Sequence, residues 1–353
     1  MTPHIDEIRS RFPALAGDTV FLENAGGSQV PDFVADRMHR YLTRTYVQLG
    51  AGYPLSQECT ATVDEAHDFA RTLVNAGDGH AILGPSSTAL LNNLAEAYGR
   101  VLQPGARIVL AETGHEANLG CWKRLERLGV EIVWWKMDPK TCECPVDGLR
   151  EVLDDRVAIV ALPQVSNLVG MITDLKEVAD AAHAVGARVV ADGVAYAPHR
   201  AIDVQAWDVD FYVYSAYKVY GPHLAVMYGK SEALAQLTGP NHFFVADDDL
   251  PYKFEPGGVN HESCAGLLGL GDYLKFLVGA DDAAPCDRGV VEAAFARMEE
   301  LEKPSTNTLL GYLNRHPRVQ TVGCGCGGPA RVGTVSFLHE SRKSQEISAE
   351  VDK

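Results

Sequence analysis

The sequence predicts an α/β fold built on a mostly parallel sheet of seven strands with helices on both faces. Between about residues 80 and 230, short apolar runs alternate with stretches that carry apolar residues at helical spacing. This alternation is typical of parallel sheets that are covered on both sides. Only residues 215–223 separate the last two runs, which is too short for a crossover helix, so we expect that pair to be antiparallel.

The predicted strands follow one another at regular intervals. In chain order they are 80–83, 106–111, 130–135, 156–162, 187–192, 210–214 and 224–229. After the fourth, the stretch TDLKEVADAAHAVG has helical spacing, and we expect it to begin with a capping Thr173 and to close on Gly186. Ligands of open sheets collect at the carboxyl ends of the strands, so we expect the chemistry there.

Length, charge and cysteine usage narrow the class of protein. With 353 residues we expect one large and one small domain. A net charge of −16 argues against a nucleic-acid partner, and no apolar run is long enough for a membrane span. The first residues resemble no targeting signal, so we expect a cytoplasmic location with reduced thiols for the eight cysteines. The two C-x-C pairs lack the spacing of a zinc site, and no metal is expected.

Polar residues follow nearly every predicted strand. They are Ser86, Ser87, Thr88, His115, Ser166, Asn167, Asp192, Ser215, Tyr217 and Lys218. Each one taken alone also fits a helix cap or a turn, because the same residue types are favoured there. Their convergence on one edge of the sheet favours a binding site.

The residue types at this edge suggest four recognition elements. The helix start at Ser86–Thr88 offers backbone N–H groups and hydroxyls to a phosphate. Asp192 ends an apolar strand, so its carboxylate needs a partner such as a cationic ring nitrogen. His115 could lie flat on an aromatic ligand, or it could be a structural or solvent-facing histidine. A desolvated Lys218 would lose its proton more easily and could attack a carbonyl. Together these elements describe pyridoxal 5′-phosphate.

At these residues the sequence resembles the class V aminotransferase family, most closely its cysteine desulfurase and selenocysteine lyase branch. The resemblance runs through FLENAGGSQ, SSTALLNNLA, ETGHEANLGCW, QVSNLVG, ADGVAYAPH, DVQAWDVDFYVYSAYKVYGP and FEPGGVNHE. It implies the fold type I architecture of pyridoxal phosphate enzymes, with a smaller α+β domain beside the sheet. We expect an N-terminal segment at 1–20 that packs with the small domain, a large domain at 21–245, and a small domain at 246–353 that is incomplete at its C-terminus.

The resemblance also implies roles for individual residues. Lys218 is the Schiff-base lysine and moves the α-proton, His115 stacks on the ring, Asp192 pairs with the ring nitrogen, Asn167 lies near the ring hydroxyl or the substrate carboxylate, and Ser87, Thr88, Ser215 and Tyr217 hold the phosphate. Asn24 faces an amino-acid substrate. The family implies a homodimer in which segment 256–260 reaches the partner's site and, for desulfurases, a protein that accepts sulfur.

Several positions depart from the family pattern. Ala195 stands where many desulfurases have Gln, Tyr217 replaces the usual His before the lysine, and Gly258 replaces a phosphate-binding Thr. Cys324 and Cys326 could supply a nucleophilic thiolate or simply form a turn of small residues. The expected reaction is cleavage of the C–S bond of cysteine or a related amino acid. An epimerase, an aminotransferase, another β-eliminating lyase and a cofactor-binding protein with little activity are the alternatives.

Overall fold

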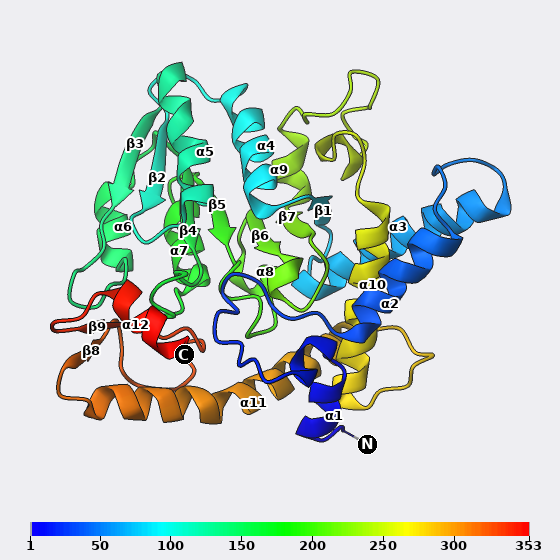
Figure 1. Cartoon of the computed structure of the whole chain (residues 1–353). Helices are drawn as coiled ribbons and strands as arrows, with labels where there is room; N and C mark the ends of the chain where they lie inside the picture. The colour runs from blue at the N-terminus through cyan, green and yellow to red at the C-terminus, as the bar shows by residue number, and fades with distance from the viewer. Residues whose placement is uncertain (1, 353) are drawn as a thin grey trace.

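A seven-stranded sheet forms the centre of the molecule (Figure 1), in a computed structural model that describes residues 2–352. Its strands are β1 (His80–Gly84), β2 (Arg107–Ala111), β3 (Glu131–Trp135), β4 (Val157–Pro163), β5 (Arg188–Asp192), β6 (Phe211–Ser215) and β7 (Ala225–Gly229). Their order across the sheet is β1-β7-β6-β5-β4-β2-β3, and β7 pairs antiparallel with both β1 and β6 while the other pairs are parallel. The predicted strands and the antiparallel last pair are confirmed.

Helices cover both faces of this sheet, because its strands are apolar on both sides. On β6, Phe211 and Val213 belong to one buried cluster, whereas Tyr212 and Tyr214 belong to another. The first cluster includes side chains of α4 (Ser87–Gly99), α5 (Gly120–Lys123) and α9 (Ser231–Ala235). The second includes side chains of α3 (Pro54–Val74), α6 (Val146–Val152), α7 (Leu175–His183), α8 (Val204–Trp207), α10 (His261–Val278) and α11 (Arg288–Arg315). The predicted three-layer α/β architecture is therefore confirmed.

The start of α7 differs from the sequence prediction by one residue. Asp174 caps this helix, since its carboxylate accepts a hydrogen bond of 3.1 Å from the backbone N–H of Glu177. Thr173 instead donates its backbone N–H to the carbonyl of Gln164 at 2.7 Å. The prediction that Thr173 caps the helix is wrong, because this contact holds Thr173 beside the end of β4.

The two ends of the chain pack near the carboxyl edge of the sheet. In Figure 1 the N-terminal segment, in dark blue, lies between the strands and α11, in orange. The remaining elements are α1 (Ile5–Ser10), α2 (Asp32–Arg44), α12 (Ser344–Val351), the antiparallel strands β8 (Val319–Thr321) and β9 (Phe337–His339), and the 3₁₀ helices η1 (Pro13–Ala16), η2 (Glu116–Asn118), η3 (Arg124–Leu128), η4 (Ala216–Lys218) and η5 (Tyr252–Phe254). Helix α10 packs on α2 and α3 and shares the core of the sheet. The domain boundaries after residues 20 and 245 stay a prediction.

Two sequence-level expectations concern membranes and thiols. Within residues 2–352, no helix combines the length and the apolar character that crossing a bilayer requires. Cys324 and Cys326 form a disulfide, so the expectation of reduced thiols is wrong for this pair. Their Cα atoms lie 5.3 Å apart, within the usual range for a disulfide.

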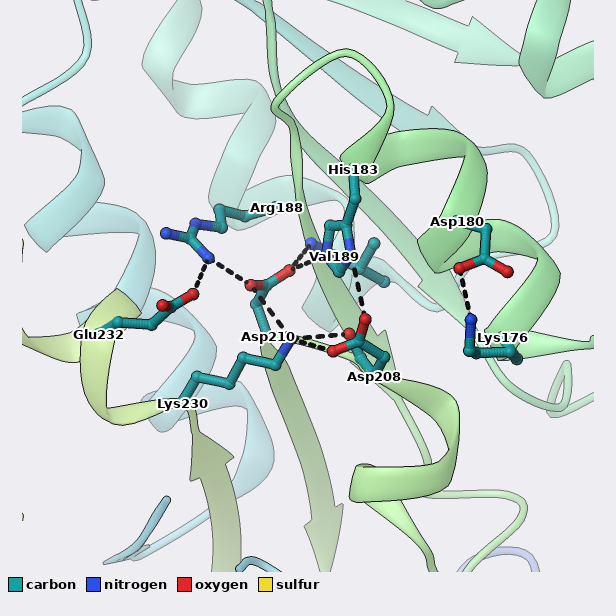
Figure 2. A network of polar contacts seen from close by, with 9 residues as sticks. All are labelled: Lys176, Asp180, His183, Arg188, Val189, Asp208, Asp210, Lys230 and Glu232. Carbon is teal, nitrogen blue, oxygen red and sulfur yellow. Dashed lines mark hydrogen bonds and ion pairs between the residues drawn. The ribbon is translucent and has the colours of Figure 1, made fainter. Parts of the chain in front are cut away.

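A charged network closes the opposite, amino edge of the sheet (Figure 2). The carboxylate of Asp210, which is fully buried, accepts hydrogen bonds from Arg188 at 2.8 Å, from the Val189 backbone at 2.8 Å and from His183 at 2.9 Å. Burial raises the pKa of Asp210, but these donors outweigh that effect and hold the pKa below its usual range. The network therefore ties the first residues of β5 and β6 to the end of α7.

Replacing Asp210 tests how much this network contributes to stability. Asp210→Ala should lower the free energy of unfolding by about 3 kcal/mol, because it leaves the buried Val189 N–H without its acceptor and removes the buried partner of His183 and Arg188. Urea denaturation measures the change. Glu232→Ala is the matched control: Glu232 contacts the same Arg188 but its side chain is 68% exposed, so its loss should cost less than about 0.5 kcal/mol. Equal effects of the two variants would contradict this assignment.

Candidate active site

A single cavity of about 1070 Å³ lies at the carboxyl ends of the strands. All the residues that the sequence singled out as cofactor-binding or catalytic line it: Ser87, Thr88, His115, Asn167, Asp192, Ser215, Tyr217 and Lys218. They come from segments that follow β1, β2, β4, β5 and β6, and the sheet brings them together because parallel strands end at the same edge. Asn24 and Ala195 line the cavity too, whereas segment 256–260 of the same chain does not.

Hydroxyl groups and a helix start form one end of the cavity. Ser86 caps α4, since its Oγ accepts a hydrogen bond of 3.1 Å from the backbone N–H of Ala89. The hydroxyls of Ser87 and Ser215 lie 2.8 Å apart and are both buried, while Thr88 is exposed. Free backbone N–H groups at the start of a helix, together with neighbouring hydroxyls, suit an anion such as a phosphate.

Asp192 places a buried carboxylate in the cavity without a full set of partners. The residue is 6% exposed. Within the described chain, the hydrogen bond to its carboxylate comes from the backbone N–H of Val194 at 2.9 Å. Burial raises the pKa of Asp192, and the Val194 hydrogen bond and the electrostatic influence of His115 and Lys218 only partly oppose this shift. A cationic group bound in the cavity would compensate the carboxylate.

Lys218 ends the short helix η4, directly after β6. Its side chain is half-buried, and Nζ lies 5.9 Å from the centroid of the Tyr217 ring. No carboxylate of the described residues lies within ion-pair distance of this amine. The amine therefore lines the cavity without a salt bridge, as a group that must react with a bound carbonyl requires.

His115 and Asn167 occupy exposed positions at the cavity surface. The Nδ1 atom of His115 accepts a hydrogen bond of 3.1 Å from the Ala117 backbone, so the ring is fixed at the start of η2. Asn167 follows β4 in the turn that Ser166 begins by accepting a hydrogen bond from Leu168 at 3.4 Å. Both side chains are placed to contact a ligand.

Sequence reasoning missed most of the cavity wall opposite the strands. The segment from Thr19 to Gln29 contributes much of it, and α11 contributes Met298, Leu301 and Glu302. His199 forms a short ion pair with Glu302 at this wall. These residues are far apart in the sequence, and helical periodicity could have indicated only that α11 has an apolar face.

The cavity has the functional groups that pyridoxal 5′-phosphate needs. Hydroxyls and helix N–H groups suit its phosphate, the Asp192 carboxylate suits a protonated ring nitrogen, and the Lys218 amine suits its aldehyde. The burial of the Asp192 carboxylate without a charged partner is the observation that favours this fit, because a cation in the cavity would stabilise its negative charge.

Comparisons with known proteins agree with this chemistry. The family model "Aminotransferase class-V" matches residues 20–350. The chain is 37% identical over 363 residues to the aminotransferase-like protein FGM3 of Gibberella zeae, covering 99% of this chain and 85% of that protein. It is 30% identical over 356 residues to the cysteine desulfurase-like protein ustD of Aspergillus flavus, covering 99% and 78%. The structure of the cysteine desulfurase CsdA from Escherichia coli is similar with a TM-score of 0.79 and 27% identity, covering 98% of this chain and 84% of that one.

Gly193 directly follows the cavity residue Asp192 and allows a test of the packing beside it. A Cβ atom at Gly193 would overlap the hydroxyl of Tyr212, which is fully buried and donates a hydrogen bond of 2.6 Å to Gln164. Gly193→Ala should therefore lower the free energy of unfolding by about 3 kcal/mol, measured by urea denaturation. Gly17→Ala is the control, because a Cβ there meets nothing within 4 Å. A stable Gly193→Ala variant would show that Tyr212 can move.

Proposed function

Because the chain belongs to the class V aminotransferase family, whose enzymes depend on pyridoxal 5′-phosphate, we propose that it cleaves the C–S bond of cysteine or a related amino acid, with Lys218 as the residue that binds the cofactor. One observation above all supports the proposal. The buried carboxylate of Asp192 lies in the same cavity as Lys218 and is close enough to be influenced by its charge.

The cofactor, when bound, supplies a protonated ring that accepts electrons as a bond at the substrate α-carbon breaks. Asp192 keeps the ring nitrogen protonated, because a carboxylate that burial has made costly gains a cationic partner. His115 packs against the ring face, and the Ala117 hydrogen bond to its Nδ1 holds the imidazole in place. These two residues bind the ring and set its charge.

Lys218 has two roles in this proposal. Its amine, which lines the cavity and is half-buried, would hold the cofactor through its aldehyde. As a free amine it would serve as the base that takes the proton from the substrate α-carbon. The Tyr217 ring at 5.9 Å limits the directions in which Nζ can move.

The remaining residues anchor the cofactor phosphate and orient the ring or the substrate. Ser87, Thr88 and Ser215 hold the phosphate through hydroxyls and the start of α4, and Tyr217 adds a phenol at the same end. Asn167 lies at the surface, where its amide can bind the ring hydroxyl or the substrate carboxylate. Because the phosphate is held firmly, the cofactor keeps one orientation and the reacting bond is aligned with its ring.

The balanced reaction converts cysteine and a thiol into alanine and a persulfide. The C–S bond breaks, the sulfur passes to the thiol, and a proton returns to the amino acid. Among the described residues, no cysteine lines the cavity. The assay should therefore supply dithiothreitol as the acceptor, so that activity does not depend on a thiol of the chain.

A product screen separates the candidate reactions. Sulfide and alanine from cysteine would support the proposal. A keto acid formed together with a second amino acid, or an inverted stereocentre, would instead identify an aminotransferase or an epimerase. A coloured protein that forms no product from any amino acid would show cofactor binding with little activity.

Assembly and location belong to the same proposal. We propose a cytoplasmic homodimer in which segment 256–260, which does not line its own cavity, reaches that of the partner, and a separate protein that accepts the sulfur. Light scattering coupled to size-exclusion chromatography gives the oligomeric state, and a monomer of full activity would contradict this arrangement.

Lys218→Ala tests the assignment of the cofactor-binding lysine. Because no other residue would bind the aldehyde, the purified variant should lack the visible absorbance band of the lysine-bound cofactor and lose cysteine turnover by at least about 1000-fold. Lys176→Ala is the control, since Lys176 does not line the cavity and pairs with Asp180 on the same helix (Figure 2). A visible band that persists in Lys218→Ala would mean that another lysine binds the cofactor.

Asp192→Asn tests the assignment of the ring partner. The amide keeps the size of the side chain but cannot compensate a ring cation, so kcat/KM should fall about 100-fold. Asp208→Asn is a matched control: Asp208 has a φ of +59°, which Asn also tolerates, and it contacts Lys230 away from the cavity. Unchanged kcat/KM in Asp192→Asn would exclude the proposed role of Asp192.

A further inference from the structure

A serine of the N-terminal segment hydrogen-bonds to the backbone of the Lys218 loop. Ser28 is separated from Tyr217 by 189 positions in the sequence, yet its Oγ donates a hydrogen bond of 3.1 Å to the Tyr217 carbonyl. The Ser28 backbone N–H donates to the same carbonyl at 3.0 Å. The backbone N–H of Tyr220 in turn donates to the Ser28 hydroxyl at 2.7 Å. Ser28 thus binds the backbone on both sides of Lys218.

The loop needs this support because of its backbone conformation. Tyr220 has a φ of +59°, in the left-handed region that residues other than glycine rarely adopt. Within the loop, the backbone N–H groups of Val219 and Gly221 donate to the carbonyl of Ala216 at 2.8 and 2.9 Å, and that of Ala216 donates to the carbonyl of Leu224 at 2.7 Å. Among the described residues, the N–H of Tyr220 has no acceptor other than the Ser28 hydroxyl. A strained residue at a functional site persists when its surroundings hold it there.

The hydroxyl of Ser28 both donates to the loop and accepts from it. It has one proton, which it gives to the Tyr217 carbonyl, and it accepts a hydrogen bond from the Tyr220 N–H. Ser28 lines the cavity, but its hydroxyl has no proton left to donate to a ligand. The hydrogen bonds that it makes act on the backbone that carries Lys218.

We propose that Ser28 is a positioning residue that fixes the direction of the Lys218 amine by holding the backbone of Tyr217 and Tyr220. The inference rests on the proposed function, because it concerns the lysine to which the cofactor is attached. Without the Ser28 hydroxyl, the Tyr220 N–H loses its acceptor and the loop can leave the left-handed conformation. The amine then samples several directions, and only some of them allow it to reach a bound aldehyde.

The experiment compares Ser28→Ala with Ser28→Thr, which keeps the hydroxyl. Cofactor-free protein is mixed with pyridoxal 5′-phosphate, and the growth of the visible band of the lysine-bound cofactor gives the rate of attachment. The pH at which this band titrates is then measured. Ser28→Ala should attach the cofactor about tenfold more slowly and titrate at a shifted pH, whereas Ser28→Thr should stay within about twofold of the wild type.

A second serine provides the matched control. Ser10→Ala also removes a hydroxyl that donates to a backbone carbonyl, that of Glu7 at 2.8 Å, but it lies at the exposed end of α1. This variant should match the wild type in attachment rate and titration. Thermal unfolding of the cofactor-free proteins shows whether each variant is folded. If Ser28→Ala is unfolded, Ser28→Cys replaces it, because a thiol has nearly the same size but hydrogen-bonds weakly.

The outcomes separate this inference from the proposed function. A folded Ser28→Ala with wild-type attachment rate and titration would overturn the positioning role while leaving the role of Lys218 intact. A Ser28→Thr variant as slow as Ser28→Ala would also overturn it, because the hydroxyl would then not be the cause. If the wild type itself forms no visible band, the proposed function fails and this inference fails with it.

Discussion

Burial of the sheet on both faces is the constraint on which the rest of the structure depends. Side chains along the central strands alternate between two apolar cores, so a charged group within such a strand would be buried away from water. Polar chemistry is therefore confined to the two edges where the strands begin and end. One edge carries the compensated network around Asp210, and the other carries the cavity with Asp192 and Lys218.

Two buried carboxylates on neighbouring strands show how the edges differ. Asp210 directly precedes β6. Its carboxylate accepts hydrogen bonds from His183, Arg188 and Val189, and its pKa lies below the usual range. Asp192 ends β5 with one backbone donor, and burial raises its pKa. The first carboxylate has its partners within the protein and stabilises the fold. The second carboxylate lacks a charged partner within the protein, and a bound cation can take that place. This difference distinguishes a binding group from a structural one.

Local patterns explain what the sequence could predict. All seven strands and the antiparallel pair β6 and β7 were predictable, because apolar runs and short connections are properties of adjacent residues. The convergence of Ser87 and Lys218 on one cavity followed from the rule for parallel strand ends. Ser28 and Glu302 were missed, because their roles depend on contacts formed only in the folded chain. The helix cap was misplaced by one residue, because Thr173 and Asp174 are both residue types that favour this position. The sequence carries no periodic pattern that pairs Ser28 with Tyr217.

The contact between Ser28 and the Lys218 loop has a consequence for biosynthesis. During translation Ser28 leaves the ribosome long before Tyr217 has been made. The hydrogen bonds between this segment and the Lys218 loop can therefore form only later. Helix α11, which forms the opposite wall, emerges later still. A nascent chain can thus build its sheet while the pocket is still open, and the pocket is complete only after α11 has been made.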